Sequence, residues 1–348
     1  MKAYVFHGQG RAGLEEVATP EPGPGEVRLR VAATALNHLD VFGRTGVSGP
    51  GIREHHYPHV SGVDVAGTVD VAGAAVEDPR PGTSVVVYAG ISCGRCELCH
   101  RGETSMCRDY RIFGEQTWGG LAEYAIVPAA NLMKLPDGFD LTAAAAAPAA
   151  FTTAWRLLVT AGEIRPGDRV LVVGAGGGVA SAALSIAVAA GALVYATSGS
   201  GWKLERALAL GALGAVNHSE RDLDEWAMEV TGGRGMDLAV DSVGAATWRR
   251  SIRSLAPGGR LCVCGATSGD TPDMSIRELY QFHRRILGAP MGGRKDFDAA
   301  MAMVLGGRLK PVIHAVYPLE RTGEALDELE AARQFGKIVI EPAARGGG

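Results

Sequence analysis

Residues 170–192 read VLVVGAGGGVASAALSIAVAAGA. A valine-rich apolar run comes first, a glycine-rich turn follows it, and small and apolar residues fill the rest. This order predicts a buried strand, a tight turn and a helix. Glycines allow the backbone to approach a pyrophosphate closely, and the free N–H groups at the start of the helix bind that anion. The stretch therefore predicts a dinucleotide site; the alternative is a similar turn in an α/β domain that binds no nucleotide.

The turn fits one register of the glycine fingerprint best, Gly174-x-x-Gly177-x-x-Ala180. A third glycine is commonest at the last of these positions, and alanine is tolerated there. We therefore expect Gly174, Gly177, Gly178 and Val179 to contact the cofactor.

The rest of the chain predicts how this site is framed. Strands and helices alternate from residue 169 to residue 289, which predicts a parallel sheet covered by helices on both faces. The earlier part of the chain holds short β-like runs broken by Gly and Pro, at residues 27–32, 67–71, 84–88 and 122–128. The fold class is therefore α/β, with a β-rich domain over residues 1–155, a doubly wound domain over 156–291 and a return to the first domain over 292–348.

The end of the second strand of the doubly wound domain indicates which cofactor binds. An acidic residue there would hold the ribose of NAD and repel a 2′-phosphate, but ATSGSGWK at residues 196–203 has none. Ser198 and Ser200 can donate to phosphate oxygens and Lys203 supplies charge, which favours NADP(H), with NAD(H) as the alternative. For Lys203 the competing interpretation is a solvated residue in the next helix. The same sheet edge is expected to carry three residues that follow later strands, Val243, Gly265 and Ala266.

Four of the six cysteines lie in CGRCELCHRGETSMC, residues 93–107. Their spacing is Cys93-x2-Cys96-x2-Cys99-x7-Cys107. Four thiolates complete the tetrahedral shell of a structural Zn²⁺ ion, and an iron–sulfur cluster is the alternative. Cys262 and Cys264 alternate on a later strand, where we expect small buried hydrophobic residues.

Composition limits the other classes of function. The chain has 348 residues and a net charge of −4, which favours two domains and gives no electrostatic reason to expect nucleic acid or an anionic membrane as partner. Its longest apolar segment, near residues 143–150, is rich in alanine and too short to cross a bilayer. The start shows no signal peptide, so a cytoplasmic protein is expected. The expected partner is a small-molecule substrate.

Several motifs together resemble the medium-chain dehydrogenase/reductase superfamily of zinc alcohol dehydrogenases and quinone reductases. They are the cysteine lobe, GGLAEYAIVP at 119–128, AAFTTAW at 149–155, the GAGGGVA turn and the closing FGKIVIEP. The resemblance implies a GroES-like catalytic domain followed by a Rossmann cofactor domain. It places Thr153 near the nicotinamide and Lys337 at a recurrent position that we assign to cofactor binding. It also implies a homodimer or homotetramer, formed through the last strand near residues 286–289.

The resemblance also shows where a catalytic zinc would bind. In the family's alcohol dehydrogenases the ligands are a Cys, a His and a second Cys or acid, which fall here on Asn37, Val63 and Ala149. The hydroxyl that relays a proton falls on Leu39. Asn is a poor zinc ligand, and Val, Ala and Leu neither ligate nor relay. The catalytic half of the chain therefore resembles the zinc-independent quinone reductases, which carry an Asn-x-x-Asp pattern, here Asn37 and Asp40.

Four residues are candidates for catalysis: Asn37, His38, Asp40 and Tyr57. Asn37 can bond a substrate carbonyl or only its own turn, and His38 can shuttle a proton or point into the structure. Asp40 is expected to brace the loop, and Tyr57 to line the substrate mouth or donate a proton. The neighbouring histidines suggest a metal site, but a solvated loop or pocket rim is favoured for His55, His56 and His59.

The function predicted from these residues is hydride transfer from NADP(H) to an activated C=C bond or quinone, without catalytic zinc. Conjugated acceptors need orientation and a hydrogen bond more than a metal. One alternative is an alcohol dehydrogenase with unusual ligands, recruiting His38, His59 or Asp64. Another is an NADPH-binding protein without turnover.

Overall fold

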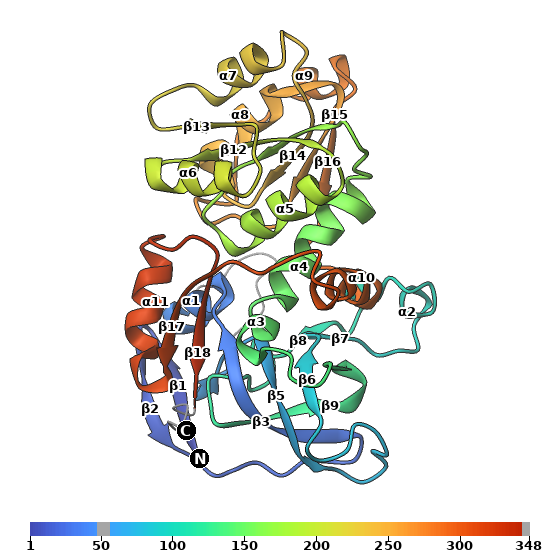
Figure 1. Ribbon diagram of the computed structural model, residues 1–348, viewed down its shortest axis with the longest axis vertical. Coiled ribbons are helices and arrows are strands. Elements are labelled where there is room, and N and C mark those ends of the chain that lie inside the picture. Colours follow the sequence, from blue (N-terminus) through green and yellow to red (C-terminus); the bar gives the residue numbers. More distant parts are fainter. Residues whose placement is uncertain (47–55, 343–348) are drawn as a thin grey trace. The chain divides into compact units, whose positions relative to one another are not determined.

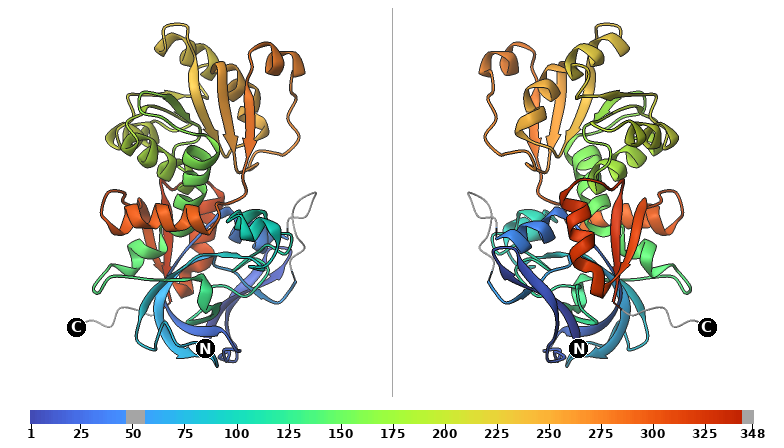
Figure 2. Two further views of the ribbon diagram at one scale, coloured as in Figure 1. Left: turned by 90° about the vertical axis from the view of Figure 1, so that its right-hand side faces the viewer. Right: turned by 90° about the vertical axis from the view of Figure 1, so that its left-hand side faces the viewer.

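The computed structural model describes residues 1–46 and 56–342 (Figures 1 and 2). The chain divides into two compact units. One unit is Met1–Ala149 together with Ile313–Gly348, and the other is Ala150–Val312. We describe each unit by itself.

The second unit is built on a six-stranded parallel sheet. Its strands are β11 (Arg169–Val172), β12 (Leu193–Ser198), β13 (Gly214–Asn217), β14 (Met236–Asp241), β15 (Leu255–Val263) and β16 (Arg285–Gly288). Their order is β13-β12-β11-β14-β15-β16, and every pairing is parallel. The order is that of a doubly wound nucleotide-binding sheet, whose topology reverses between β11 and β14. The predicted Rossmann fold is confirmed.

Helices cover both faces of this sheet. They are α5 (Gly178–Ala189), α6 (Gly201–Ala209), α7 (Leu223–Val230), α8 (Ala245–Arg253) and α9 (Ile276–Gln281). Leu171 and Val173 pack in one cluster with Trp226 of α7 and Ile252 of α8. The alternate residues of β11 point to the opposite face and are also fully buried. A strand buried on both faces explains why its sequence is a continuous apolar run.

The first unit is rich in short strands. They are β1 (Lys2–Gly8), β2 (Arg11–Glu16), β3 (Glu26–Ala35), β4 (His59–Val60), β5 (Asp64–Ala72), β6 (Ser84–Val87), β7 (Gly90–Ile91), β8 (Arg111–Ile112), β9 (Tyr124–Pro128), β10 (Leu132–Lys134), β17 (Ile313–Pro318) and β18 (Lys337–Glu341). The largest sheet has the order β10-β6-β5-β3-β18-β17, with β9 also paired to β3. A three-stranded sheet, β2-β1-β4, and the pair β7-β8 complete the unit. This is the β-rich unit that the sequence predicts.

Short helices connect these strands. They are α1 (His38–Thr45), α2 (Glu97–His100), α3 (Leu141–Ala145) and α11 (Thr322–Glu330), with 3-10 turns at Thr104–Met106, Ala129–Asn131 and Leu319–Arg321. Leu36 and Val41 join a buried cluster that includes Phe6 of β1, Leu326 of α11 and Ile340 of β18. This cluster fixes α1, which carries two of the four candidate catalytic residues, His38 and Asp40, and has a third, Asn37, as its N-cap.

The C-terminal segment returns to the first unit through β18. Val339 pairs with Ala35 and Ile340 with Thr34, so β18 lies antiparallel to β3, and β17 lies parallel on its other side. The sequence did not predict β17.

The return begins at Ile313, whereas the sequence placed it at residue 292. The difference arises because α10 (Arg294–Leu305) packs in the second unit, beside α4 (Pro148–Trp155) and the π-helical turn Arg156–Ala161. Asp296 accepts the N–H of Gly293 at 2.8 Å and a hydrogen bond from Thr160, and the Arg156 guanidinium is 3.6 Å away. The second unit correspondingly begins at Ala150, where the sequence suggested residue 156.

No helix within residues 1–46 and 56–342 is long and apolar enough to span a membrane. The predicted oligomer stays a prediction; β16, through which it is expected to form, is the last strand in the sheet order.

Candidate functional site

The first candidate segment begins with a helix cap. Asn37 has extended backbone angles, φ −131° and ψ 163°, and immediately precedes α1. Its N–H donates to the Asp40 carboxylate at 2.6 Å, the pattern by which a third-position acid closes the start of a helix. Gly46 ends the helix in the left-handed conformation, with φ 75°. The polar residues of LNHLDVFG are thus placed by a local capping arrangement.

Asp40 ties this helix to the loop before β5. It is fully buried, and its second oxygen accepts the hydroxyl of Ser61 and the N–H of Gly62, the latter at 2.9 Å. Burial raises the pKa of Asp40 above its usual value, and these hydrogen bonds lower it in part. Both carboxylate oxygens are occupied by donors of the fold, as a bracing role requires.

Asn37 belongs to a buried cluster with Asp64 and Lys337. Its Nδ2 donates to Asp64 Oδ2 at 3.0 Å and to the Ala35 carbonyl at 3.2 Å. Lys337 Nζ donates to Asn37 Oδ1 at 2.7 Å and to Asp64 Oδ2 at 2.9 Å. The side chains of Lys337 and Asp64 are 4% and 0% exposed. An ammonium and a carboxylate therefore form a buried pair, bridged by an amide.

This cluster lies where the resemblance places a catalytic zinc. Ala149, the position of the later ligand, donates its N–H to Asp64 Oδ1 at 2.6 Å, and Val63 is buried next to Asp64 in sequence. Two of the three ligand positions, Asn37 and Ala149, are both bonded to Asp64, but the three positions hold an amide and two aliphatic side chains. Asn and aliphatic groups do not make a zinc shell.

The alternative ligand set does not assemble either. Within the part of the chain that the structure describes, the four cysteines are the one group of three or more His, Cys, Asp or Glu side chains placed to hold a metal. His59, expected on a solvated loop or a pocket rim, is instead buried in β4, and its Nε2 lies 3.0 Å from the Gly114 carbonyl. Pairing of β4 with β1 causes this burial. His56 is exposed, and His55 lies outside the described residues.

His38 is the first residue of α1 and is half-buried, with its ring centroid 6.5 Å from that of Phe42. Burial lowers the pKa of His38 below its usual value, and the positive charge of Lys337 lowers it further. The imidazole is therefore neutral at pH 7. A role in proton transfer stays a prediction.

Tyr57 packs against the C-terminal half of α1. Its hydroxyl donates to the Gly43 carbonyl at 2.7 Å, and burial raises its pKa. A Cβ at Gly8 would lie 2.9 Å from the ring, so the glycine leaves room for it. These contacts hold α1 beside β1, and the predicted role of Tyr57 as proton donor or lining residue stays a prediction.

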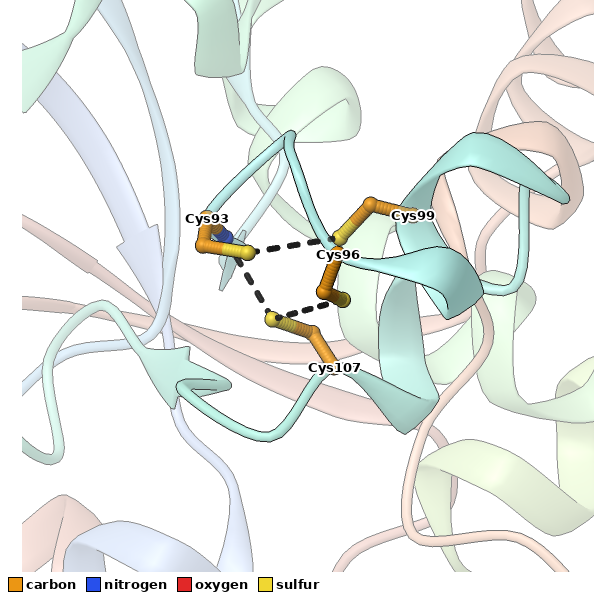
Figure 3. Close-up of side chains that lie close together, drawn as sticks. All are labelled: Cys93, Cys96, Cys99 and Cys107. Atoms are coloured by element: carbon orange, nitrogen blue, oxygen red, sulfur yellow. Dashed lines mark hydrogen bonds between the residues drawn. The ribbon is translucent and has the colours of Figure 1, made fainter.

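The four cysteines of residues 93–107 converge (Figure 3). The sulfurs of Cys93 and Cys99 are 4.0 Å apart, those of Cys96 and Cys107 are 3.9 Å apart, and all four lie within 4.8 Å of one another. A tetrahedral Zn²⁺ with Zn–S bonds of about 2.3 Å requires sulfurs roughly 3.8 Å apart. The backbone N–H of Cys99 lowers the pKa of Cys96 to about 6. The donor set and its spacing therefore fit zinc.

The other two cysteines are separate from this lobe. Cys262 is fully buried in β15, and burial raises the pKa of its thiol to about 12. Cys264 lies just after the strand and is only partly buried, and burial raises the pKa of its thiol to about 12. The prediction of a buried strand residue is confirmed for Cys262 and wrong for Cys264, because β15 ends at Val263, and both thiols stay protonated.

The glycine-rich turn of the second unit has the shape that a pyrophosphate needs. Gly174 has φ +73°, and a Cβ there would lie 3.0 Å from Val243 Cγ2. A Cβ at Gly176 would lie 2.6 Å from Lys203 Cδ. Helix α5 begins at Gly178 after Gly177, without a side-chain cap, so its first N–H groups are left for an anion. The residues fit a dinucleotide.

The end of β12 brings its polar residues to this turn. Lys203 is only 8% exposed and packs over Gly176, so the alternative of a solvated lysine is wrong. Burial lowers the pKa of Lys203. Ser198 is buried, and its Oγ accepts the N–H of Ser200 at 3.2 Å. One neighbour was missed from sequence: His218 Nδ1 lies 3.1 Å from Thr197 Oγ1, because β13 pairs with β12.

The loops after β14 and β15 meet at the same sheet edge, as predicted. A Cβ at Gly265 would lie 2.6 Å from the Ser242 carbonyl, and one at Gly244 would lie 2.8 Å from Ala266 Cα. Asp241 organises this edge by accepting the N–H of Val243 at 2.8 Å. It also accepts hydroxyl hydrogens from Thr247 and Ser251. Thr153 is buried on α4, and its place beside the nicotinamide stays a prediction.

Fold and site together define a class: a nucleotide-dependent dehydrogenase or reductase with a four-cysteine lobe in a β-rich unit. Two family models match, the alcohol dehydrogenase GroES-like domain over residues 23–137 and the zinc-binding dehydrogenase domain over residues 178–306. The chain belongs to the medium-chain dehydrogenase/reductase superfamily and is an NAD(P)-dependent oxidoreductase.

Relatives of both reaction types are similar over their full length. An acryloyl-coenzyme A reductase of Sulfurisphaera tokodaii is 30% identical over 98% of this chain and 100% of the relative. An NAD-dependent alcohol dehydrogenase of Sulfolobus acidocaldarius is 30% identical over 98% of this chain and 99% of the relative. A crystal structure of an NAD-dependent alcohol dehydrogenase superposes with a TM-score of 0.93 at 42% identity, covering 99% of this chain and 100% of the other.

Proposed function

We propose that the protein reduces an activated C=C bond or a quinone with NADPH and uses no catalytic metal. The observation that carries the proposal is the buried cluster of Asn37, Asp64 and Lys337. Asn37 takes the first ligand position of a catalytic zinc, and its side chain is bonded instead to Asp64 and Lys337. Alcohol oxidation without a metal would need another group to stabilise an alkoxide. A conjugated acceptor is already polarised, so orientation and hydrogen bonding suffice.

The reaction needs few protein groups. Bound NADPH would supply the hydride to the β carbon of the acceptor. The electron pair of the C=C bond then moves toward the carbonyl oxygen, and a proton from solvent or from His38 is added at the α carbon. Because His38 is neutral at pH 7, it accepts a solvent proton before it gives one. The similarity to an acryloyl-coenzyme A reductase supports this reaction type, and the similarity to alcohol dehydrogenases supports the alternative.

The cofactor preference proposed is NADP(H). It is supported by the absence of an acid at the end of β12 and by Lys203, whose ammonium lies beside the glycine-rich turn. Ser198 and Ser200 add hydroxyls at the same place. The four cysteines are proposed to hold a structural Zn²⁺ ion.

One experiment separates the candidate functions: zinc content combined with NADPH oxidation across enones, enoyl thioesters, quinones and primary alcohols. We expect about one zinc per chain and turnover with a conjugated acceptor. About two zincs, with alcohol oxidation that a chelator abolishes, would show an alcohol dehydrogenase and contradict the proposal. Tight NADPH binding without oxidation by any acceptor would show the non-catalytic alternative.

A further inference from the structure

We infer that the Lys337 ammonium binds the carbonyl oxygen of the acceptor and stabilises the negative charge that develops there. The inference rests on the proposed function, and it gives Lys337 a task toward substrate, where the sequence suggested one toward the cofactor. In this site the ammonium supplies a positive charge beside the acceptor oxygen.

The hydrogen bonds within the cluster decide whether Asn37 or Lys337 can donate to the carbonyl oxygen of the substrate. The Asn37 amide has two N–H groups, and both are used, by Asp64 and by the Ala35 carbonyl. Asn37 cannot donate to a substrate without breaking one of these bonds. The ammonium has three N–H groups, and within the described part of the chain two of them have partners, Asn37 Oδ1 and Asp64 Oδ2. One strong donor therefore remains at Lys337.

The surroundings fix the position of this ammonium. Lys337 begins β18, which pairs with β3 directly before Asn37, and its side chain is 4% exposed. Two oxygens hold the nitrogen at 2.7 and 2.9 Å. A charge that is already oriented and desolvated costs little reorganisation when a negative oxygen forms beside it.

The pairing with Asp64 leaves the ammonium able to act on a further oxygen. The Asp64 carboxylate is shared among three donors: Lys337, Asn37 Nδ2 and the Ala149 N–H. The negative charge of Asp64 is therefore shared among three donors and compensates the Lys337 ammonium only in part. His38 is neutral, so it adds no competing cation to the cluster.

The step balances without any further reactant. Hydride adds to the β carbon, the π electron pair moves to the α carbon and the carbonyl oxygen, and Lys337 holds that oxygen by an N–H···O bond. A proton from solvent then adds at the α carbon, and the carbonyl reforms. Lys337 keeps its proton throughout, so the net reaction consumes one acceptor, one NADPH and one proton, and yields the saturated product and NADP⁺.

The test uses Lys337→Met, with Lys134→Met as the matched control. Lys134 also pairs with a carboxylate in the first unit, that of Asp78 at 2.6 Å, but on the surface. The measurements are kcat and KM with the enone that the wild type reduces fastest, the dissociation constant of NADPH, and binding of the saturated ketone product to the NADP⁺ complex. For Lys337→Met we expect kcat to fall about 100- to 1,000-fold. Product affinity should fall roughly tenfold, and NADPH affinity should change less than about threefold.

Several outcomes overturn the inference and remain distinct from failure of the proposed function. A folded Lys337→Met variant with kcat near that of the wild type overturns the inference. A large loss of NADPH affinity with kcat unchanged also overturns it and would assign Lys337 to cofactor binding.

If Lys337→Met does not fold, Lys337→Ala with added methylammonium decides: recovery of kcat supports a catalytic ammonium, and no recovery in a folded variant contradicts it. If Lys337→Ala does not fold either, Lys337→Arg decides: it keeps the charge but moves the donor, so a large loss of kcat supports the inference and wild-type kcat contradicts it. If no conjugated acceptor supports NADPH oxidation by the wild type, the proposed function itself fails.

Discussion

Replacing Asp64 with asparagine tests whether the buried cluster depends on a full negative charge. In the wild type, Asp64 Oδ1 accepts the Ala149 N–H at 2.6 Å, and Oδ2 accepts from Asn37 at 3.0 Å and Lys337 at 2.9 Å. Every neighbour of the carboxylate is a donor. The new amide has one NH₂ group, so in either orientation it turns a donor toward another donor.

The expected cost follows from burial. Asp64 is 0% exposed and Lys337 is 4% exposed, so the variant leaves an ammonium buried without its counter-charge. Removing one partner of a buried ion pair costs about 3–5 kcal/mol. A buried donor left without an acceptor costs about 1–3 kcal/mol, and this cost is part of the same loss. We therefore expect Asp64→Asn to lower the free energy of unfolding by about 3–5 kcal/mol.

Urea unfolding followed by circular dichroism measures the effect, and Asp78→Asn is its control. Asp78 pairs with Lys134 at 2.6 Å, but the two side chains are 59% and 56% exposed. Water and salt screen such a pair, so its loss should cost less than about 1 kcal/mol. The variant Asp64→Asn/Lys337→Met should be more stable than the sum of the single changes predicts, because no buried ammonium remains. Equal losses below about 1 kcal/mol for Asp64→Asn and Asp78→Asn would refute the reasoning.

Three further predictions concern the metal, the cofactor and pH. Cys96→Ser should release most of the bound zinc and lower the melting temperature, whereas Cys262→Ser should keep the zinc; metal analysis showing unchanged zinc in Cys96→Ser would remove the structural site. Lys203→Ala should weaken NADPH binding about 10- to 100-fold and NADH binding much less, measured by calorimetry; equal losses would contradict 2′-phosphate recognition. Because burial lowers the pKa of His38, the unfolded chain binds more protons below about pH 6.5, and stability falls there. His38→Gln should reduce that loss, and identical urea midpoints for both proteins from about pH 7.5 to 5.5 would count against it.

The doubly wound unit could be predicted closely from sequence. Its strands are apolar because both faces are covered, and its turns are rich in glycine where the backbone must approach a ligand. Each of these signals lies within a short stretch of sequence, so the pattern of that stretch is enough to predict the element. The cysteine lobe is similar, since four thiols within residues 93–107 can converge without help from distant segments.

The boundaries and some environments could not be predicted in this way. Helix α10 has the pattern of any amphipathic helix, and the contacts of Asp296 with Thr160 and Arg156 place it in the second unit. The sequence predicts His59 on a solvated loop or a pocket rim, but pairing of β4 with β1 buries it. His218 reaches the end of β12 because β13 pairs there in parallel.

By itself the sequence determined the superfamily, the dinucleotide turn and the cysteine lobe, because each depends on residue types within short stretches. Only the tertiary structure decided which side chains surround Asn37. Lys337 is 300 residues from Asn37 and 273 from Asp64, and it reaches them because β18 pairs with β3. Sheet pairing between distant segments depends on packing of the whole unit, which no local pattern contains.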